Sequence, residues 1–132
     1  MGVQTYSHNI AGEREFGFAQ AIKVGETIYV SGQLSHDEAG NFLFPNDFDA
    51  QTAQVYANFE KVLTHYGVTR NQVVSETQFV VNLPAYNNAM AAANLAYFGD
   101  HRPTSSTVGV ESLFFAGQLI EISFVIDTRL PA

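Results

Sequence analysis

An α+β fold is predicted by this sequence, with two helices and about six strands in the order β-β-β-α-β-α-β-β. Alternating or β-branched segments recur along the chain, and two longer segments have helical spacing. No repeat, linker or low-complexity tract interrupts them. A chain of 132 residues fits one domain, so residues 1–132 are expected to fold as a single unit.

The first strands are predicted to be joined near Gly25. Residues 16–22 alternate between the two faces of a strand, and residues 27–30 are rich in β-forming side chains. A further short apolar run, residues 41–44, ends at Pro45 and predicts a hairpin with a third strand.

Two helices follow. The first begins at Asp47 or Asp49, either of which can accept a hydrogen bond as the N-cap, and Gly67 ends it. Between these residues one helical face is apolar, at Val55, Phe59, Val62, Leu63 and Tyr66. The second helix is predicted from Pro84, which suits a first helical turn, to about Gly99.

The remaining strands are predicted at residues 73–83, 106–110 and 119–127, with a turn around residues 116–117 before the last. Two helices are too few to cover both faces of six strands, so both are expected on one face. The other face carries apolar side chains, which predicts an oligomer.

Composition excludes several classes of function. The net charge of −7 would repel a phosphate backbone, so no nucleic acid partner is expected. The absence of cysteine excludes disulfides, thiolate metal sites and cysteine nucleophiles. Residues 1–15 lack the apolar core of a secretion signal, and no apolar run approaches the ~20 residues of a membrane span. We therefore expect a cytoplasmic protein.

Several separated motifs carry a family resemblance. They are Ala-Gln-Ala-Ile-Lys-Val-Gly at 19–25, Ile-Tyr-Val-Ser-Gly-Gln at 28–33, residues 51–59, residues 96–110 and the strand around Glu121. Together they resemble the RidA/YjgF family of small imine and enamine deaminases. The resemblance implies a six-stranded mixed sheet with two helices on one face and a chorismate-mutase-like homotrimer. It also implies small-molecule clefts between subunits and a reaction without a cofactor.

The resemblance further implies which residues form each cleft. One subunit supplies Phe18, Ser31 and Gly32, and its neighbour supplies Ser105, Thr107 and Glu121. Glu121 matches the glutamate that positions a water or relays a proton, and Gly32 matches the glycine whose carbonyl faces the substrate nitrogen. Phe18 takes the place of a tyrosine, and the backbone amide of Thr107 matches one that contacts the substrate carboxylate.

Ser105 is the main departure from the family pattern. Deaminating relatives read Arg-Pro-Ala-Arg in this segment, where the second arginine grips the substrate carboxylate. An arginine fork makes two charge-assisted hydrogen bonds of about 1.5 to 3 kcal/mol each, whereas a serine offers one neutral donor. We therefore expect weak binding of simple 2-imino acids, unless a cation such as Arg14 substitutes.

Local patterns leave alternatives for the main site residues. Glu121 lies between Ile120 and Ile122, where burial would raise the pKa of its carboxyl and suit proton transfer. The same residue could face solvent on an edge strand or pair with an arginine. Gly32 could be a simple turn glycine. Phe114 and Phe115 are expected either in a subunit interface or in a pocket wall.

Other catalytic chemistries have little support. Ser105, Ser106 and Thr107 have no histidine placed by the sequence as a base. The histidines show no metal-ligand spacing, at His8, His36, His65 and His101. Two functions therefore remain: a cofactor-independent hydrolase that acts on C–N bonds of imines or enamines other than simple 2-imino acids, and a non-catalytic trimer that binds small molecules.

Overall fold

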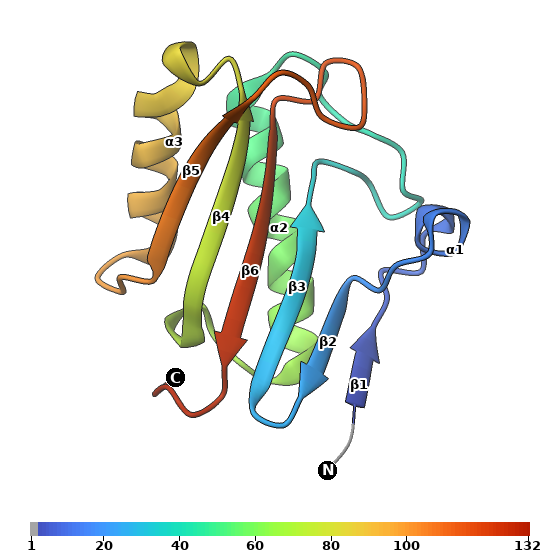
Figure 1. Ribbon diagram of the computed structural model, residues 1–132, viewed down its shortest axis with the longest axis vertical. Coiled ribbons are helices and arrows are strands. Elements are labelled where there is room, and N and C mark those ends of the chain that lie inside the picture. The colour runs from blue at the N-terminus through green and yellow to red at the C-terminus, as the bar shows by residue number, and fades with distance from the viewer. Residues whose placement is uncertain (1–2) are drawn as a thin grey trace.

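A twisted six-stranded sheet carries two long helices on one face in this computed structural model, which describes residues 3–132 (Figure 1). The elements are β1 Val3–Tyr6, α1 Ala11–Phe16, β2 Ala21–Val24, β3 Thr27–Gln33, α2 Phe48–Tyr66, the 3-10 turn η1 Arg70–Gln72, β4 Val73–Val81, α3 Leu83–Phe98, β5 Thr104–Val110 and β6 Ile120–Asp127.

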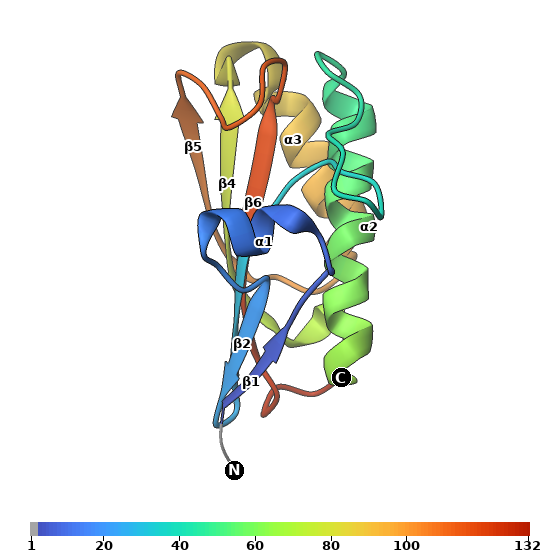
Figure 2. The same ribbon diagram turned by 90° about the vertical axis from the view of Figure 1, so that its right-hand side faces the viewer.

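The sheet order is β1-β2-β3-β6-β4-β5. The pair β4 and β5 is parallel and every other neighbouring pair is antiparallel, so the sheet is mixed. Helices α2 and α3 lie on the same side of it (Figure 2). The predicted α+β class, with six strands and two covering helices, is therefore confirmed, and the short helix α1 is an addition.

The N-terminal third differs from the prediction. Phe16 ends helix α1 instead of beginning a strand, and Gly17 follows it in the left-handed conformation with φ of 77°. Residues 41–44 form no strand, because only His36 and Phe42 make an isolated bridge there. The sixth strand is β1, which pairs with β2 along the sheet edge.

Both long helices begin and end where local chemistry predicts. Asp47, rather than Asp49, caps α2 by accepting a hydrogen bond from the Ala50 amide at 3.1 Å. Gly67 ends that helix with a φ of 66°, a conformation that favours glycine. Pro84 lies in the first turn of α3.

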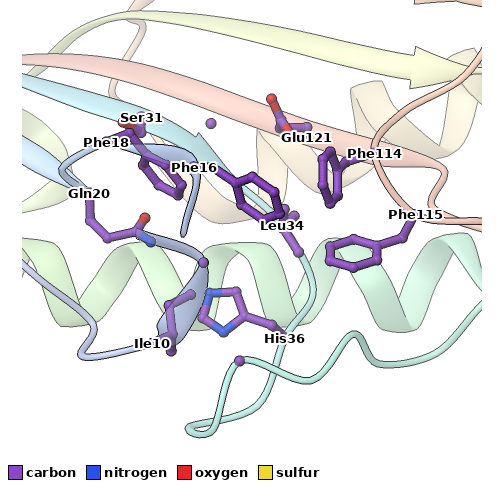
Figure 3. A pocket seen from close by; sticks show the side chains of 13 residues that line it. Ile10, Phe16, Phe18, Gln20, Ser31, Leu34, His36, Phe114, Phe115 and Glu121 are labelled. Atoms are coloured by element: carbon purple, nitrogen blue, oxygen red, sulfur yellow. The ribbon is translucent and has the colours of Figure 1, made fainter. Parts of the chain in front are cut away.

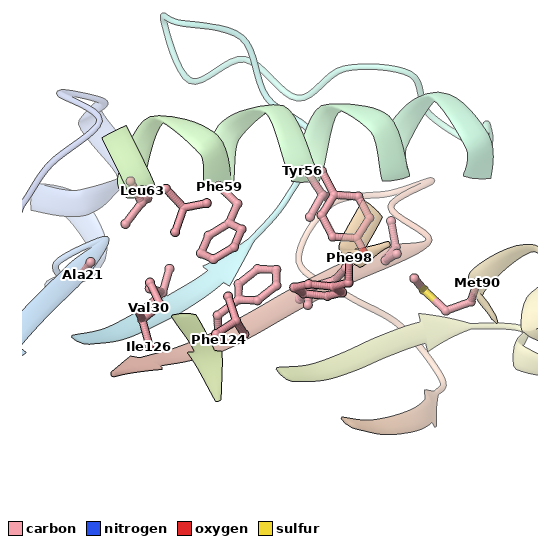
Figure 4. Packing of buried hydrophobic residues seen from close by; sticks show 14 of the residues in the cluster. Ala21, Val30, Tyr56, Phe59, Leu63, Met90, Phe98, Phe124 and Ile126 are labelled. Carbon is pink, nitrogen blue, oxygen red and sulfur yellow. The ribbon is translucent and has the colours of Figure 1, made fainter. Parts of the chain in front are cut away.

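The core lies between the sheet and α2 (Figure 4). Its centre is the stacked pair of Phe59 from α2 and Phe124 from β6, with ring centroids 3.7 Å apart. Alternate residues of β6 are buried, which places Ile122 and Phe124 toward the helices and Glu121 toward the opposite face. The predicted apolar face of α2 is confirmed.

The face of the sheet away from α2 and α3 is uncovered in the single chain. Tyr29 is 55% exposed there, and Val108 is 41% exposed. Their strand neighbours on the same face are Val125 and Phe79. None of the helices within residues 3–132 has the length and apolar character needed to cross a lipid bilayer.

Gln51, fully buried in the first turns of α2, binds three backbone groups that belong to two loops. Its amide nitrogen donates to the carbonyl oxygens of Phe44 at 2.7 Å and Gly117 at 2.8 Å. Its amide oxygen accepts from the Leu119 amide at 2.8 Å. This side chain therefore holds the loop before α2 against the loop that leads into β6.

We predict that Gln51→Leu lowers the free energy of unfolding by about 3 kcal/mol, because buried backbone groups each lose a partner. Gln54→Leu is the control, since half-buried Gln54 donates only to the Asn58 side chain and should cost under about 1 kcal/mol. Urea unfolding at equilibrium measures both variants. Equal losses would show that the Gln51 contacts do not hold the loops.

Candidate functional site

A cavity of about 330 Å³ opens beside helix α1, near the end of β3 (Figure 3). Side chains from α1, β3, β6 and the loop before β6 form its wall. The lining residues are Ile10, Gly12, Phe16, Phe18, Gln20, Ser31, Gly32, Leu34, His36, Gly40, Phe114, Phe115 and Glu121. Four of the six predicted site residues therefore meet in one place.

The closest approach in this cavity is between Glu121 and Gly32. A Cβ atom built on Gly32 would overlap the Glu121 carboxylate and would lie 2.7 Å from its Cγ. The pairing of β3 with β6 shifts register between Val30 and Gln33, at the same place. Gly32 thus lies inside a strand, and the Glu121 side chain, rather than a turn, requires glycine there.

Glu121 is half-buried on a central strand. Burial raises the pKa of its carboxyl, and a hydrogen bond with the Gln118 side chain partly opposes that rise. Strand β6 lies between β3 and β4, so the edge-strand alternative is wrong. Glu121 forms no ion pair within residues 3–132 of the single chain, where Arg129 and Asp127 form the one salt bridge found.

Ser31 and Phe18 form the wall beside Gly32. The Ser31 hydroxyl donates to the carbonyl oxygen of Ala19 at 2.6 Å, which ties β3 to the segment before β2. The Phe18 ring is 41% exposed. It lies just after Gly17, so the left-handed turn that ends α1 brings it to the cavity.

Phenylalanine rings form much of the remaining wall. Phe16 and Phe114 pack edge to face with centroids 5.0 Å apart, and Phe114 packs in the same way on Phe115 at 4.9 Å. Phe115 also stacks on Phe42 at 5.2 Å. In the single chain Phe114 and Phe115 therefore lie in the cavity wall, and their place in a subunit interface stays a prediction.

Ser105 and Thr107 lie elsewhere, on the edge strand β5. They pair with Glu76 and Gln78 of β4, and the Thr107 hydroxyl donates to Gln78 Oε1 at 2.6 Å. Glu121, by contrast, lines the same cavity as Gly32 of its own chain. Its expected place among the neighbouring subunit's residues is therefore wrong.

A second buried carboxyl, which the sequence analysis missed, lies next to Ser105. Glu76 is 1% exposed, and burial raises the pKa of its carboxyl while hydrogen bonds with Gln78 and Ser105 oppose the rise. With its side-chain amide turned so that the nitrogen faces this carboxyl, Asn94 of α3 donates to Glu76 Oε1 at 3.1 Å. Glu76 is an even number of residues from buried Val80, so both side chains lie on the same face of β4. This spacing is the one sequence signal for its burial.

Histidines that are far apart in sequence gather next to this cavity. The rings of His8 and His36 are 5.4 Å apart, and His8 Nε2 lies 2.8 Å from Gln33 Oε1. Burial lowers the pKa of His8. A second, polar cavity of about 300 Å³ adjoins these rings and is lined by Tyr6, His8, His36, Asp37, Glu38 and Lys61. No group of three potential metal ligands occurs among the described residues.

Within the single chain, Arg14 does not take the place of the arginine that deaminating relatives have at the position of Ser105. It lies exposed in the last turn of α1 and is absent from the cavity lining. Glu121 and His36 are the ionisable side chains of that lining. The cavity therefore offers one carboxyl, one imidazole and an aromatic wall.

Comparisons with known proteins support a common family. The endoribonuclease L-PSP family model matches residues 11–127. A RutC family protein from Sulfurisphaera tokodaii is 33% identical over 108 residues, which cover 82% of this chain and 85% of that protein. A 2-iminobutanoate/2-iminopropanoate deaminase from Dermatophagoides farinae is 30% identical over 99 residues, covering 73% of this chain and 74% of that protein.

Solved structures agree with these relatives. YyfA from Yersinia pestis, a Rid-family protein of unknown function, has a TM-score of 0.84 and 28% identity over 96% of this chain and 99% of its own. A putative endoribonuclease from Thermotoga maritima has a TM-score of 0.82 and 27% identity over 96% of this chain and 98% of its own.

We predict that Gly32→Ala moves the Glu121 carboxylate out of its position and lowers its pKa toward the ordinary value, because the displaced group becomes better solvated. The side chain can rotate, so the fold should survive. Gly12→Ala is the matched control, since its Cβ would make an ordinary 3.6 Å contact with Phe16. Carbon-detected NMR titration of the glutamate carboxyls measures the pKa. An unchanged Glu121 pKa in Gly32→Ala would contradict the close approach.

Proposed function

This chain belongs to the RidA/YjgF family, whose model is described as endoribonuclease L-PSP, and we propose that it is a cofactor-independent hydrolase that deaminates imines or enamines. Its substrate is proposed to be other than a simple 2-imino acid. One observation carries this proposal: the half-buried Glu121 carboxyl lies against Gly32 in a cavity walled by phenylalanine rings. Function in the cytoplasm is part of the same proposal.

Glu121 has the properties that the reaction needs. Hydrolysis adds water to the C=N bond and yields a carbonyl compound and ammonia. As a carboxylate, Glu121 accepts a proton from the water whose oxygen attacks the imine carbon. As a carboxylic acid, it returns that proton to the nitrogen, which gives a carbinolamine. The carboxylate then moves the hydroxyl proton of this intermediate to the nitrogen, so that the C=O bond forms as the C–N bond breaks and ammonia leaves. Burial raises the pKa of the Glu121 carboxyl above its ordinary value, which makes the protonated form more available for the proton transfer to nitrogen.

The preference against 2-imino acids rests on the charges in the cavity. Among the residues that the structure describes, its lining has no lysine or arginine that could bind a carboxylate. Some relatives of this chain are named 2-iminobutanoate/2-iminopropanoate deaminases, so the reaction type is familiar among them. An RNA substrate fits poorly, because the net charge of −7 repels phosphates.

We also propose a homotrimer in which Ser105 and Thr107 complete the cavity of a neighbouring copy. The uncovered sheet face exposes Tyr29 and Val108, and burying them would remove apolar surface from water. Ser105 and Thr107 lie exposed on the edge strand β5, away from the cavity of their own chain. The alternative function, a non-catalytic binding trimer, uses the same cavity and differs only in turnover.

We predict that Glu121→Gln lowers turnover by about 10²-fold without lowering the melting temperature, because the amide cannot transfer the proton and Glu121 has no ion-pair partner within residues 3–132. The probe is the imine formed in situ from phenethylamine by a flavin amine oxidase, followed by ammonia release. Glu111→Gln, an exposed glutamate in the loop before β6, is the control.

The same assay includes 2-iminopropanoate, formed by an amino acid oxidase, as the disfavoured substrate. The wild-type protein should accelerate hydrolysis of this anion much less than hydrolysis of the imine derived from phenethylamine. Full turnover by Glu121→Gln would remove Glu121 from the mechanism. Without acceleration of any imine by the wild type, the binding function would stand instead.

We predict a trimer at micromolar concentration in multi-angle light scattering. Val108→Asp should weaken it, because a carboxylate on the uncovered sheet face would be buried without a partner. Leu95→Asp is the control, since Leu95 is an exposed apolar residue on the helix layer. A monomeric wild type would contradict the trimer, and so would equal effects of the two variants.

A further inference from the structure

The lining of the cavity, within residues 3–132, contains no lysine or arginine. Glu121 is its one acidic lining residue, and His36 is the one lining side chain able to carry a positive charge. Arg14, the nearest basic residue in α1, is exposed and outside the lining, and Lys61 lines the other cavity. An organic anion placed here would therefore meet a carboxyl without a permanent counter-charge.

The wall presents aromatic rings close to this carboxyl. Phe16, Phe18, Phe114 and Phe115 all line the cavity with Glu121 (Figure 3). Phe114 remains 64% exposed in spite of its contacts with two other rings, so part of its surface is free for a ligand. The face of a phenyl ring carries negative electrostatic potential and attracts a cation within ~6 Å of its centre.

A carboxylate beside several phenyl rings is the combination that recognises organic cations. We propose that this cavity binds a small organic cation, a protonated amine or iminium with an aryl or alkyl substituent, and rejects carboxylates. The charged nitrogen lies between Glu121 and the rings, and the substituent packs on the phenylalanine wall. This inference rests on the proposed function, because it names the chemical class of that substrate.

Size and overall charge agree with such a ligand. A volume of about 330 Å³ is at the small end of ligand sites and suits a molecule with one ring and a short side chain. The protein's net charge of −7 attracts cations from solution. Strand β5 itself carries no lysine or arginine, so this strand of another copy would bring no cation to the cavity either.

Glu121 also gains from a bound cation. Burial raises the pKa of its carboxyl, because the ionised form is poorly solvated there. A cation within ~4 to 6 Å supplies that charge and favours ionisation. The iminium ion, which is the protonated imine, is the form that water attacks most readily. A site that holds the cation therefore also holds the reactive species.

Isothermal titration calorimetry with three matched probes tests this inference. Benzyltrimethylammonium is the cation, phenylacetate the anion and 2-phenylethanol the neutral control. The intact protein should bind the cation at least about tenfold more tightly than phenylacetate. Glu121→Gln should weaken binding of the cation by about tenfold and leave the affinity for 2-phenylethanol unchanged. Glu111→Gln should change neither affinity. Phe114→Leu should weaken binding of the cation more than binding of 2-phenylethanol.

Equal affinity for the cation and phenylacetate would overturn the inference, as would undetectable binding of the cation at millimolar concentration. Unchanged cation binding by Glu121→Gln would overturn it too. The quaternary ammonium has no C=N bond, so its binding does not depend on turnover. Cation selectivity without imine hydrolysis would keep this inference and refute the hydrolase, and hydrolysis without cation selectivity would do the reverse.

Discussion

The contact between Glu121 and the backbone at Gly32 is the constraint on which the site depends. Two antiparallel strands carry these residues, and the strand pairing shifts register where they meet. Any side chain at residue 32 would occupy the space of the carboxylate. The core fixes β6 from the other face, where Phe124 stacks on Phe59 of α2. The position of one carboxyl therefore follows from the packing of the whole central sheet.

Local signals predicted the helices and most of the strands. Asp47 and Gly67 bound α2 because capping depends on a few neighbouring residues. The N-terminal third was harder, because β1 owes its place to pairing with β2, which no local pattern reveals. The alternation of Phe16 and Phe18 indicated a strand, yet Gly17 turns the chain left-handed between them. The apolar run at 41–44 packs as a loop, and Phe42 stacks on Phe115.

The site was predicted in part, for reasons of distance along the chain. Phe18, Ser31, Gly32 and Glu121 do meet, as the family resemblance implied, although Glu121 was assigned to the wrong subunit. The role of Ser105 and Thr107 depends on a second copy of the chain, which strand patterns cannot place. Glu76 was missed because a glutamate in a strand is normally taken to face solvent. Only its pairing with Ser105 and its contact with Asn94 explain its burial.

The two halves of the cavity have different origins in the fold. Glu121 and Gly32 belong to paired central strands, whereas Phe16 ends a short helix, Phe18 follows it, and Phe114 and Phe115 belong to a loop. Substitutions in strands disturb the core, but loops and helix ends tolerate change. The reactive carboxyl and the ring wall can therefore evolve separately. A lineage built on this scaffold can acquire new ligand preferences by exchanging a few loop side chains, while its chemistry stays in place.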